Sequence, residues 1–146
     1  MRSTISEKNL SILRRAEDFH GHLGPFLVIG VRMGLVGLER LNLTEDKPLR
    51  VEAFLPLRTP ISCVIDGLQI ATRCTIGNGK LFIKDSEGVR VTFKRNDGKK
   101  VVIVLNKLTF HNLMTKLLGE KLPDGKIREL AWSISTMPET ELFNTE

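Results

Sequence analysis

Apolar residues recur every three or four positions near the start of the chain, which is the spacing of a helix with one buried face. They run through residues 10–19, behind a segment at residues 4–7 that fits a capping box, and predict a first helix that ends at about Asp18. Residues 25–41 are apolar on nearly every side, as in a central helix. We therefore expect two helices first, the second of them inside the core.

Three glycines, Gly30, Gly34 and Gly37, lie on the second predicted helix. Glycine inside a helix costs roughly 1 kcal/mol relative to alanine, so we expect close approach of another backbone, from this chain or from a second subunit, as compensation. The apolar run at residues 23–38 is shorter than the roughly 18–20 residues of a membrane span. Arg32 in its middle also argues against a membrane partner.

Alternating apolar and polar residues predict four strands further along the chain. These strands are residues 49–55, 80–84, 89–95 and 100–105, the last two joined by a hairpin turn at residues 96–98. Further helices are predicted at residues 60–73 and 108–118, and residues 127–134 fit a strand or a short helix. The order α-α-β-α-β-β-β-α predicts an α+β fold, with a mixed, mainly antiparallel sheet of about four strands and helices packed on one face.

Length and composition add limits to this picture. The chain has 146 residues, 41% of them hydrophobic, which is enough for a core without disulfides. We expect one core domain over residues 1–137 and an acidic, frayed tail over residues 138–146. The first ten residues hold no apolar run of the secretory kind, so we expect a cytoplasmic location, where Cys63 and Cys74 stay reduced.

Two of the three histidines lie in His20-Gly21-His22, at the break between the first two predicted helices. Gly21 can adopt backbone angles that other residues avoid. The two imidazoles could serve as metal ligands or as acid–base groups. The alternative is a pair of ordinary polar residues in a loop.

Cys63 lies in the first turn of the third predicted helix. Peptide N–H groups there stabilise a thiolate, so we expect a lowered pKa and a residue suited to act as nucleophile or soft metal ligand. Asp66 lies on a neighbouring face. The alternative is a small buried hydrophobic residue. Cys74 would lie roughly 16 Å away along a continuous helix, too far for a disulfide unless the helix breaks early or a dimer brings the two thiols together.

Two further segments could bind anions. Residues 75–80 form a glycine-rich loop whose N–H groups could hold an anion, although a tight turn is the simpler interpretation. Basic residues cluster around the hairpin at Lys94, Arg95, Lys99 and Lys100. Nucleic acid is not expected as a partner, because Phe82 and Phe93 are the aromatic residues on these predicted strands and the net charge of +5 is modest.

Three motifs follow one another in order along the chain. They are Phe19-His20-Gly21-His22-Leu23-Gly24-Pro25 leading into Gly30-Val31-Arg32-Met33-Gly34, then Cys63-Val64-Ile65-Asp66-Gly67-Leu68-Gln69, then Cys74-Thr75-Ile76-Gly77-Asn78-Gly79-Lys80-Leu81. Together they resemble the FmdE family of formylmethanofuran dehydrogenase components, over about residues 13–105. The resemblance implies an α+β core and a relative of a molybdenum or tungsten oxidoreductase of one-carbon metabolism, connected with methanogenesis.

The resemblance also implies a shared pocket. His20, His22 and Cys63 would bind a transition metal there, zinc by default, and Cys63 with His22 would be the catalytic pair. Other implied pocket residues are Gly24, Pro25, Asp66, Gln69, Cys74 and Thr75. Many family members carry a cysteine where this chain has Gly24, and some append a cysteine-rich zinc module for which nothing after Cys74 supplies a thiol.

The leading hypothesis is a cytoplasmic, metal-binding homodimer of the FmdE type, associated with a larger molybdenum or tungsten oxidoreductase. Whether it is itself an enzyme stays open. One alternative is a non-catalytic accessory or assembly subunit of such an oxidoreductase. The other is an anion or nucleic-acid binding module that uses the basic hairpin, which predicts a steep salt dependence of binding.

Overall fold

The computed structural model describes residues 6–43, 49–119 and 121–146. Helices and strands follow one another in the order α1 (Glu7–His20), α2 (Pro25–Arg40), β1 (Leu49–Leu55), α3 (Cys63–Thr72), β2 (Leu81–Asp85), β3 (Arg90–Arg95), β4 (Lys100–Leu105), α4 (Lys107–Gly119), α5 (Asp124–Ser135), α6 (Glu139–Leu142) and β5 (Phe143–Thr145). The α+β fold is confirmed. The segment at residues 127–134, for which the sequence left two interpretations, is helical and belongs to α5.

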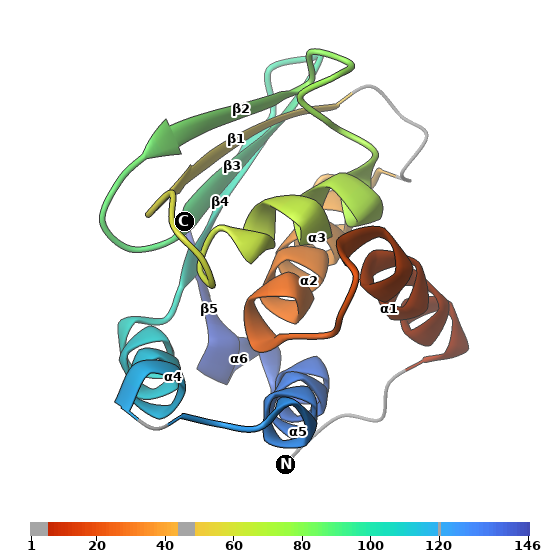
Figure 1. Cartoon of the computed structure of the whole chain (residues 1–146). Helices are drawn as coiled ribbons and strands as arrows, with labels where there is room; N and C mark the ends of the chain where they lie inside the picture. The colour runs from red at the N-terminus through yellow and green to blue at the C-terminus, as the bar shows by residue number, and fades with distance from the viewer. Residues whose placement is uncertain (1–5, 44–48, 120) are drawn as a thin grey trace.

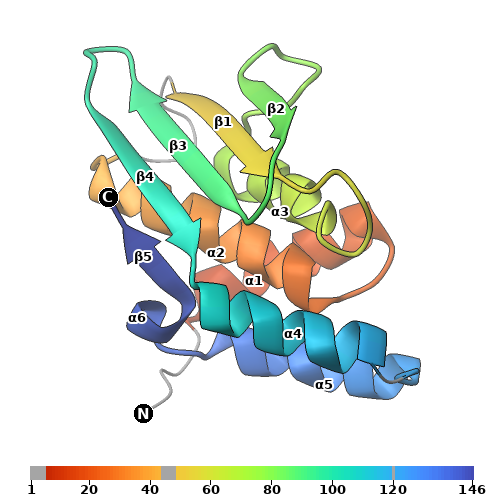
Figure 2. The ribbon, with the colours of Figure 1, turned by 90° about the vertical axis from the view of Figure 1, so that its left-hand side faces the viewer.

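The strands form one mixed sheet in the order β2-β1-β3-β4-β5. Strand β1 pairs with β2 in parallel and with β3 antiparallel, and β3 and β4 form the predicted antiparallel hairpin. Figure 1 shows α2 and α3 beneath the sheet, with α1 and α5 further from it. In Figure 2 the strands lie in front of α2 and α3, so the helices cover one face and the other face is turned outward.

The close approach expected at the glycines of α2 is made within this chain. A Cβ at Gly30 would lie 2.1 Å from the carbonyl oxygen of Val64 in α3. Conversely, a Cβ at Gly67 of α3 would lie 2.3 Å from the carbonyl oxygen of Leu27 in α2. The two helices therefore touch backbone to backbone, which side chains at these positions would prevent. This contact fixes the place of α3 against the centre of the core.

Two helix starts differ from the sequence prediction. The cap of α1 is Ser6, whose hydroxyl accepts a hydrogen bond of 3.2 Å from the backbone N–H of Asn9. The predicted capping box begins at Thr4, which lies outside the described residues. Helix α3 begins at Cys63 and not at Pro60, because the preceding residues form turns, one of them closed by a 3.1 Å hydrogen bond from the Cys63 N–H to the Pro60 carbonyl. Cys63 is thus the first residue of its helix.

The C-terminal tail is ordered, which corrects the expectation of a frayed segment at residues 138–146. Leu142 in α6 is fully buried, and Phe143 is 4% exposed. Strand β5 pairs antiparallel with β4, where Phe143 lies opposite Leu105. The acidic residues of the tail made it look solvated, but its two apolar side chains enter the core and its backbone completes the sheet edge.

Arg32 links α2 to α5 across the core. Its guanidinium donates hydrogen bonds to the carbonyl oxygens of Ile134, at 3.0 Å, and of Met137. Both carbonyls lie at the C-terminal end of α5 or just beyond it, where helix carbonyls lack partners within the helix. Burial lowers the pKa of Arg32 from its ordinary value. Within the described ranges, no helix combines the length and the apolar character that a membrane span requires.

Candidate functional site

The first histidine of the H-G-H motif is bound to α3. His20 is the last residue of α1, and Gly21 ends that helix in the left-handed conformation with a φ of 101°. The His20 Nδ1 lies 2.5 Å from Oδ2 of Asp66. A carboxylate accepts hydrogen bonds, so Nδ1 carries the proton and Nε2 carries the free lone pair when the ring is neutral. The contact joins two segments that are 46 residues apart in the sequence.

The other ring nitrogen of His20 is left without a partner. Nε2 is buried from solvent and makes no hydrogen bond to any residue that the structure describes. A buried polar atom without a partner costs on the order of 1–3 kcal/mol. A carboxylate that orients a histidine through one ring nitrogen, while the other stays free, is the arrangement found behind metal-bound histidines. His20 is therefore in the form that a metal ligand needs.

The second histidine lies beside the first and borders a cavity. The ring centroids of His20 and His22 are 4.6 Å apart, with the ring planes tilted by 44°. His22 lines a cavity of about 540 Å³ whose other walls come from α1 and the start of α5. Gly24 and Pro25 begin α2 directly behind it, and a Cβ at Gly24 would lie 3.7 Å from Nε2 of His22. A side chain at position 24 would therefore contact this ring.

The thiol of Cys63 does not behave as the sequence predicted. Burial raises the pKa of the Cys63 thiol, and the negative charge of Asp66 raises it further. Its own backbone N–H favours the thiolate, as expected for a helix start, but this effect is the smallest of the three. The expected lowering of the pKa is therefore wrong, because half-burial and a nearby carboxylate outweigh the helix terminus.

The predicted metal ligands are partly brought together. Helix α3 carries Asp66 to His20, and His22 stacks against His20. Cys63 lies on the same helix, three residues before Asp66. Across residues 6–43, 49–119 and 121–146, no group of three or more histidine, cysteine, aspartate or glutamate side chains lies close enough together to hold a metal ion. One chain thus presents two adjacent imidazoles and an orienting carboxylate.

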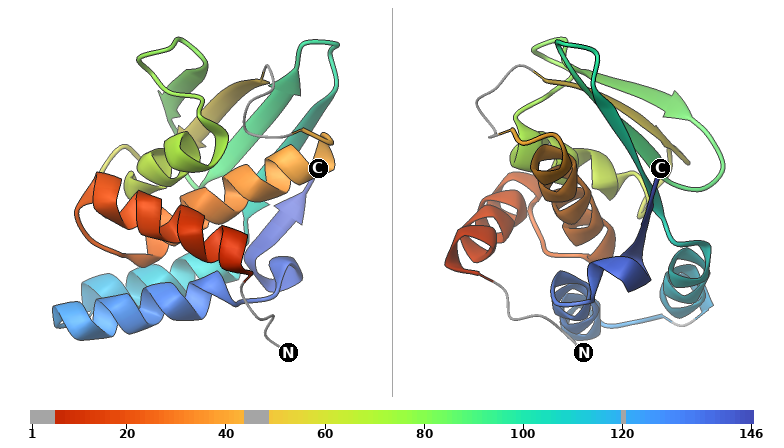
Figure 3. Two further views of the ribbon diagram at one scale, coloured as in Figure 1. Left: turned by 90° about the vertical axis from the view of Figure 1, so that its right-hand side faces the viewer. Right: turned by 180° about the vertical axis from the view of Figure 1, so that it is seen from behind.

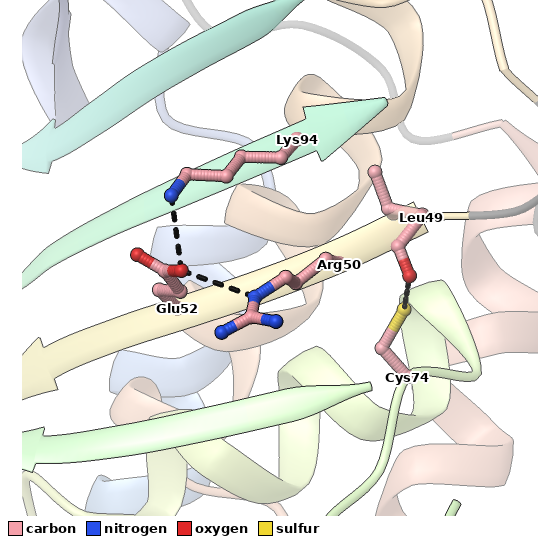
Figure 4. A network of polar contacts seen from close by, with 5 residues as sticks. All are labelled: Leu49, Arg50, Glu52, Cys74 and Lys94. Carbon is pink, nitrogen blue, oxygen red and sulfur yellow. Dashed lines mark hydrogen bonds and ion pairs between the residues drawn. The ribbon is translucent and has the colours of Figure 1, made fainter. Parts of the chain in front are cut away.

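Other predicted pocket residues lie at the opposite end of α3. Cys74 is 2% exposed, and its thiol donates a 3.3 Å hydrogen bond to the carbonyl oxygen of Leu49, as Figure 4 shows. Burial raises the pKa of the Cys74 thiol. Gln69 accepts a hydrogen bond of 3.4 Å from the N–H of Ile76. The structure therefore separates Cys74 and Gln69 from the histidines by the length of the helix.

The glycine-rich loop at residues 75–80 is closed on itself. The side-chain oxygen of Asn78 accepts hydrogen bonds from the N–H groups of Thr75, at 2.9 Å, and Lys80, at 3.0 Å. The Thr75 hydroxyl in turn accepts a 3.0 Å hydrogen bond from the Asn78 N–H. Donors that an anion would need are already used, so the loop is a tight turn.

The basic hairpin cluster is also partly neutralised. Lys94 donates a 3.1 Å hydrogen bond to Glu52, on which Arg50 also converges at 3.2 Å (Figure 4). The hydrogen bond from Lys94 is the main reason that the pKa of Glu52 is lowered. Arg95 pairs with Asp97 at the hairpin turn. Two of the four predicted cations are thus engaged within the chain.

Sequence reasoning missed the far wall of the cavity. Besides His22, the cavity is bordered by Glu17 from α1 and by Asp124 and Arg128 from α5. Arg128 forms an ion pair with Glu17, which raises the pKa of the guanidinium. Glu17 lies one helical turn before His20, so its nearness was readable from spacing. The two residues from α5 carried no such signal, since they are more than a hundred positions away.

Comparison with known proteins gives one curated relative. A protein of Archaeoglobus fulgidus, named a probable S-adenosyl-L-methionine-binding protein, is 38% identical over 97 residues. The match covers 65% of this chain and 26% of that protein, so the chain spans about a quarter of the length of the relative.

The fold and the family are shown by two further comparisons. A crystal structure of an FmdE-like protein of tungsten formylmethanofuran dehydrogenase, from Syntrophus aciditrophicus, superposes with a TM-score of 0.57 at 23% identity, over 94% of this chain and 70% of that one, and it has the same fold. The family model described as FmdE, molybdenum formylmethanofuran dehydrogenase operon, matches residues 19–144. That range runs from the H-G-H motif to the last strand, and the chain belongs to the FmdE family.

Proposed function

We propose that this FmdE-family chain is a cytoplasmic, metal-binding homodimer that works with a molybdenum or tungsten oxidoreductase of one-carbon metabolism. The observation that carries the proposal is the buried Nε2 of His20, which has no partner among the described residues while Asp66 holds Nδ1. A metal ion would satisfy this nitrogen and remove the cost of its burial. Zinc is the expected ion, because imidazole and thiolate are its usual ligands.

His20 and His22 would supply the first two ligands, since their rings are already adjacent. Cys63 would be the third, from the same chain or from a second copy, and its proton would leave on binding, as metal binding to a thiol requires. A second copy is favoured because the described part of one chain does not assemble three ligands. Many family members carry a cysteine at position 24, and a side chain there would contact His22, which also directs ligands to this place.

When bound with three protein ligands, zinc supplies an open position that polarises a water or a substrate oxygen. The chain's own groups would do the rest. Asp66 would hold the His20 ring in one tautomer, and His22 would face the cavity through which a small molecule arrives. Glu17, Asp124 and Arg128 would give that cavity a polar wall.

A second candidate is a non-catalytic accessory or assembly subunit of a larger oxidoreductase. It is favoured by the family description, which refers to the operon of molybdenum formylmethanofuran dehydrogenase. Recovery of a molybdenum or tungsten enzyme with the chain from native extract would support it, and recovery as a free homodimer would argue against it.

The decisive experiment measures zinc directly. The chain is purified without a polyhistidine tag, reconstituted with zinc, dialysed and analysed by plasma emission, with the oligomeric state followed by analytical ultracentrifugation. We expect about one zinc per chain and loss of most of it in His20→Ala. His111→Ala is the matched control, because His111 is an exposed histidine on α4. Less than about a tenth of an equivalent in the unmodified chain would contradict the proposal.

A further inference from the structure

The outward face of the sheet carries a dense set of cations. Across β2, β1 and β3, Lys84, Phe54 and Arg90 lie side by side in register. Four residues away along β1, Arg50, Lys94 and Lys100 form a second row across β1, β3 and β4. Strand pairing turns the members of each row to the same face.

This face lies opposite the helices. Leu49, Val51, Ala53 and Leu55 of β1 point to the core, and the residues between them point outward. Figure 3 shows, in the view from behind, that α1, α2, α3 and α5 all lie on the other side of the strands. In the part of the chain that the structure describes, no helix covers the outward face.

The charge of this surface has mainly one sign. The two rows present five cationic side chains, Lys84, Arg90, Arg50, Lys94 and Lys100. In the row between them Glu52 is acidic, and it is half-buried beneath Lys94 and Arg50. The whole chain has a net charge of +5, so much of its excess is concentrated here. Glu146, paired through its backbone with Val102, brings negative charge back at the β5 edge.

Flat aromatic surfaces lie between the cations. Phe82 occupies the row of Glu52 and is 40% exposed. The guanidinium of Arg50 lies 3.8 Å from the centre of the Phe82 ring, and that of Arg90 lies 4.8 Å from the centre of the Phe54 ring. Each stack presents a planar group of the kind on which nucleobases stack. A shallow cavity of about 290 Å³ runs along both phenylalanines.

We propose that the outward sheet face binds single-stranded nucleic acid. Phosphates would contact the two rows of cations, and a base would stack at the Phe82–Arg50 pair between them. A single strand is required because a base must be unpaired to lie flat on an aromatic side chain. The sequence offered Phe82 and Phe93 as platforms, but Phe93 is fully buried and Phe54 takes its place on this face.

Other occupants fit this face less well. A second copy would set like charges against each other, because an isologous contact repeats the same surface. An anionic membrane would bind the cations, yet the phenylalanines lie flat on the strands under guanidinium groups and do not protrude for insertion. Interleaved cations and aromatic planes are typical of sheets that carry single strands.

The test is fluorescence anisotropy of the full chain with labelled oligothymidylate and oligouridylate of about 12 nucleotides, a length that suits one such domain. Titrations at about 50 and 200 mM salt give the salt dependence. We expect the triple variant Lys84→Gln, Arg90→Gln, Lys100→Gln to bind about tenfold or more weakly, and its slope of log affinity against log salt to be smaller by about 2. The matched control replaces Lys107, Lys116 and Lys126, on α4 and α5, by Gln and changes affinity less than about twofold.

A second variant tests stacking without changing charge. Phe82→Leu keeps an apolar side chain at an exposed position, so the fold is retained, and we expect about fivefold weaker binding. Circular dichroism shows that each variant is folded. Three results would overturn the proposal: no binding by the unmodified chain at low salt, an equal loss in the control triple variant, or binding to vesicles of phosphatidylcholine and phosphatidylglycerol that the oligonucleotide does not compete away.

Discussion

The two ends of α3 carry the same kind of residue in opposite states. At the C-terminal end, Cys74 is buried and its thiol is bonded to Leu49, while its N–H donates to the hydroxyl of Thr72 at 3.1 Å. At the N-terminal end, Cys63 is half-buried, and neighbouring Asp66 holds a histidine whose second nitrogen has no partner in the described residues.

The difference shows which cysteine is structural. A thiol with its hydrogen bond made and its surface buried behaves as a small core residue. Groups left unsatisfied beside a cavity impose a free-energy cost that ligand binding can offset. Both ends depend on the same backbone contact between α2 and α3, so the comparison can be broken at three places: at that contact, at the open end and at the closed end.

The largest effect is expected at the contact itself. Gly30→Ala would place a Cβ against the Val64 carbonyl and push α3 away from α2. We expect a loss of about 3 kcal/mol in the free energy of unfolding, or failure to fold, measured by urea denaturation. Gly125→Ala in α5 is the control, because a Cβ there meets nothing within 4 Å. Equal stabilities of the two variants would contradict the packing argument.

The next effect concerns the open end. Asp66→Asn removes the carboxylate that orients His20, and we expect zinc affinity to fall by about 10- to 100-fold. Competition with a chromogenic chelator measures this change. Thermal unfolding of the metal-free variant should stay close to that of the unmodified chain, because Asp66 is about one-third exposed. Unchanged zinc affinity would remove Asp66 from the site.

A smaller effect is expected from comparing the two cysteines. Cys74→Ala loses a buried thiol and its bond to Leu49, so the free energy of unfolding should fall by about 1–2 kcal/mol. Cys63→Ala should cost less than about 1 kcal/mol, since the side chain is half-buried. Urea denaturation of both variants makes the comparison. The reverse order would mean that Cys63 is the structural residue.

The smallest effect is a shift in thiol titration. Burial and the Asp66 charge both raise the pKa of Cys63, so its alkylation by iodoacetamide should reach half its maximal rate at a pH above that of an ordinary thiol. Asp66→Asn removes one negative neighbour, stabilises the thiolate and should move this midpoint to lower pH. Peptide mass spectrometry separates Cys63 from Cys74. A midpoint that stays in place would show that burial alone sets the reactivity.

Much of the fold was readable from the sequence because the signals were local. The alternation at residues 49–55 predicted β1 with its observed bounds. The glycines of α2 predicted a close backbone neighbour, which α3 provides. The tail failed for the opposite reason: β5 exists because β4 offers an unpaired edge, and no pattern within residues 138–146 contains that information.

The site was predictable in its residue types but not in its contacts. The H-G-H motif and Cys63 were found from chemistry, whereas the contact between His20 and Asp66 depends on how α1 lies against α3. The direction of the Cys63 pKa was missed because burial is a tertiary property and outweighed the local effect of the helix start.

The backbone contact between α2 and α3 has a mechanical consequence. Helices that meet at Gly30 and Gly67 have no intervening side chains to rearrange, so they move as one block. Any adjustment of the histidine pair to an arriving ion must then come from α1, which is joined to α2 through the left-handed Gly21. Gly21 is thus the pivot of the molecule, and stiffening it would slow metal capture while leaving the rest of the architecture at rest.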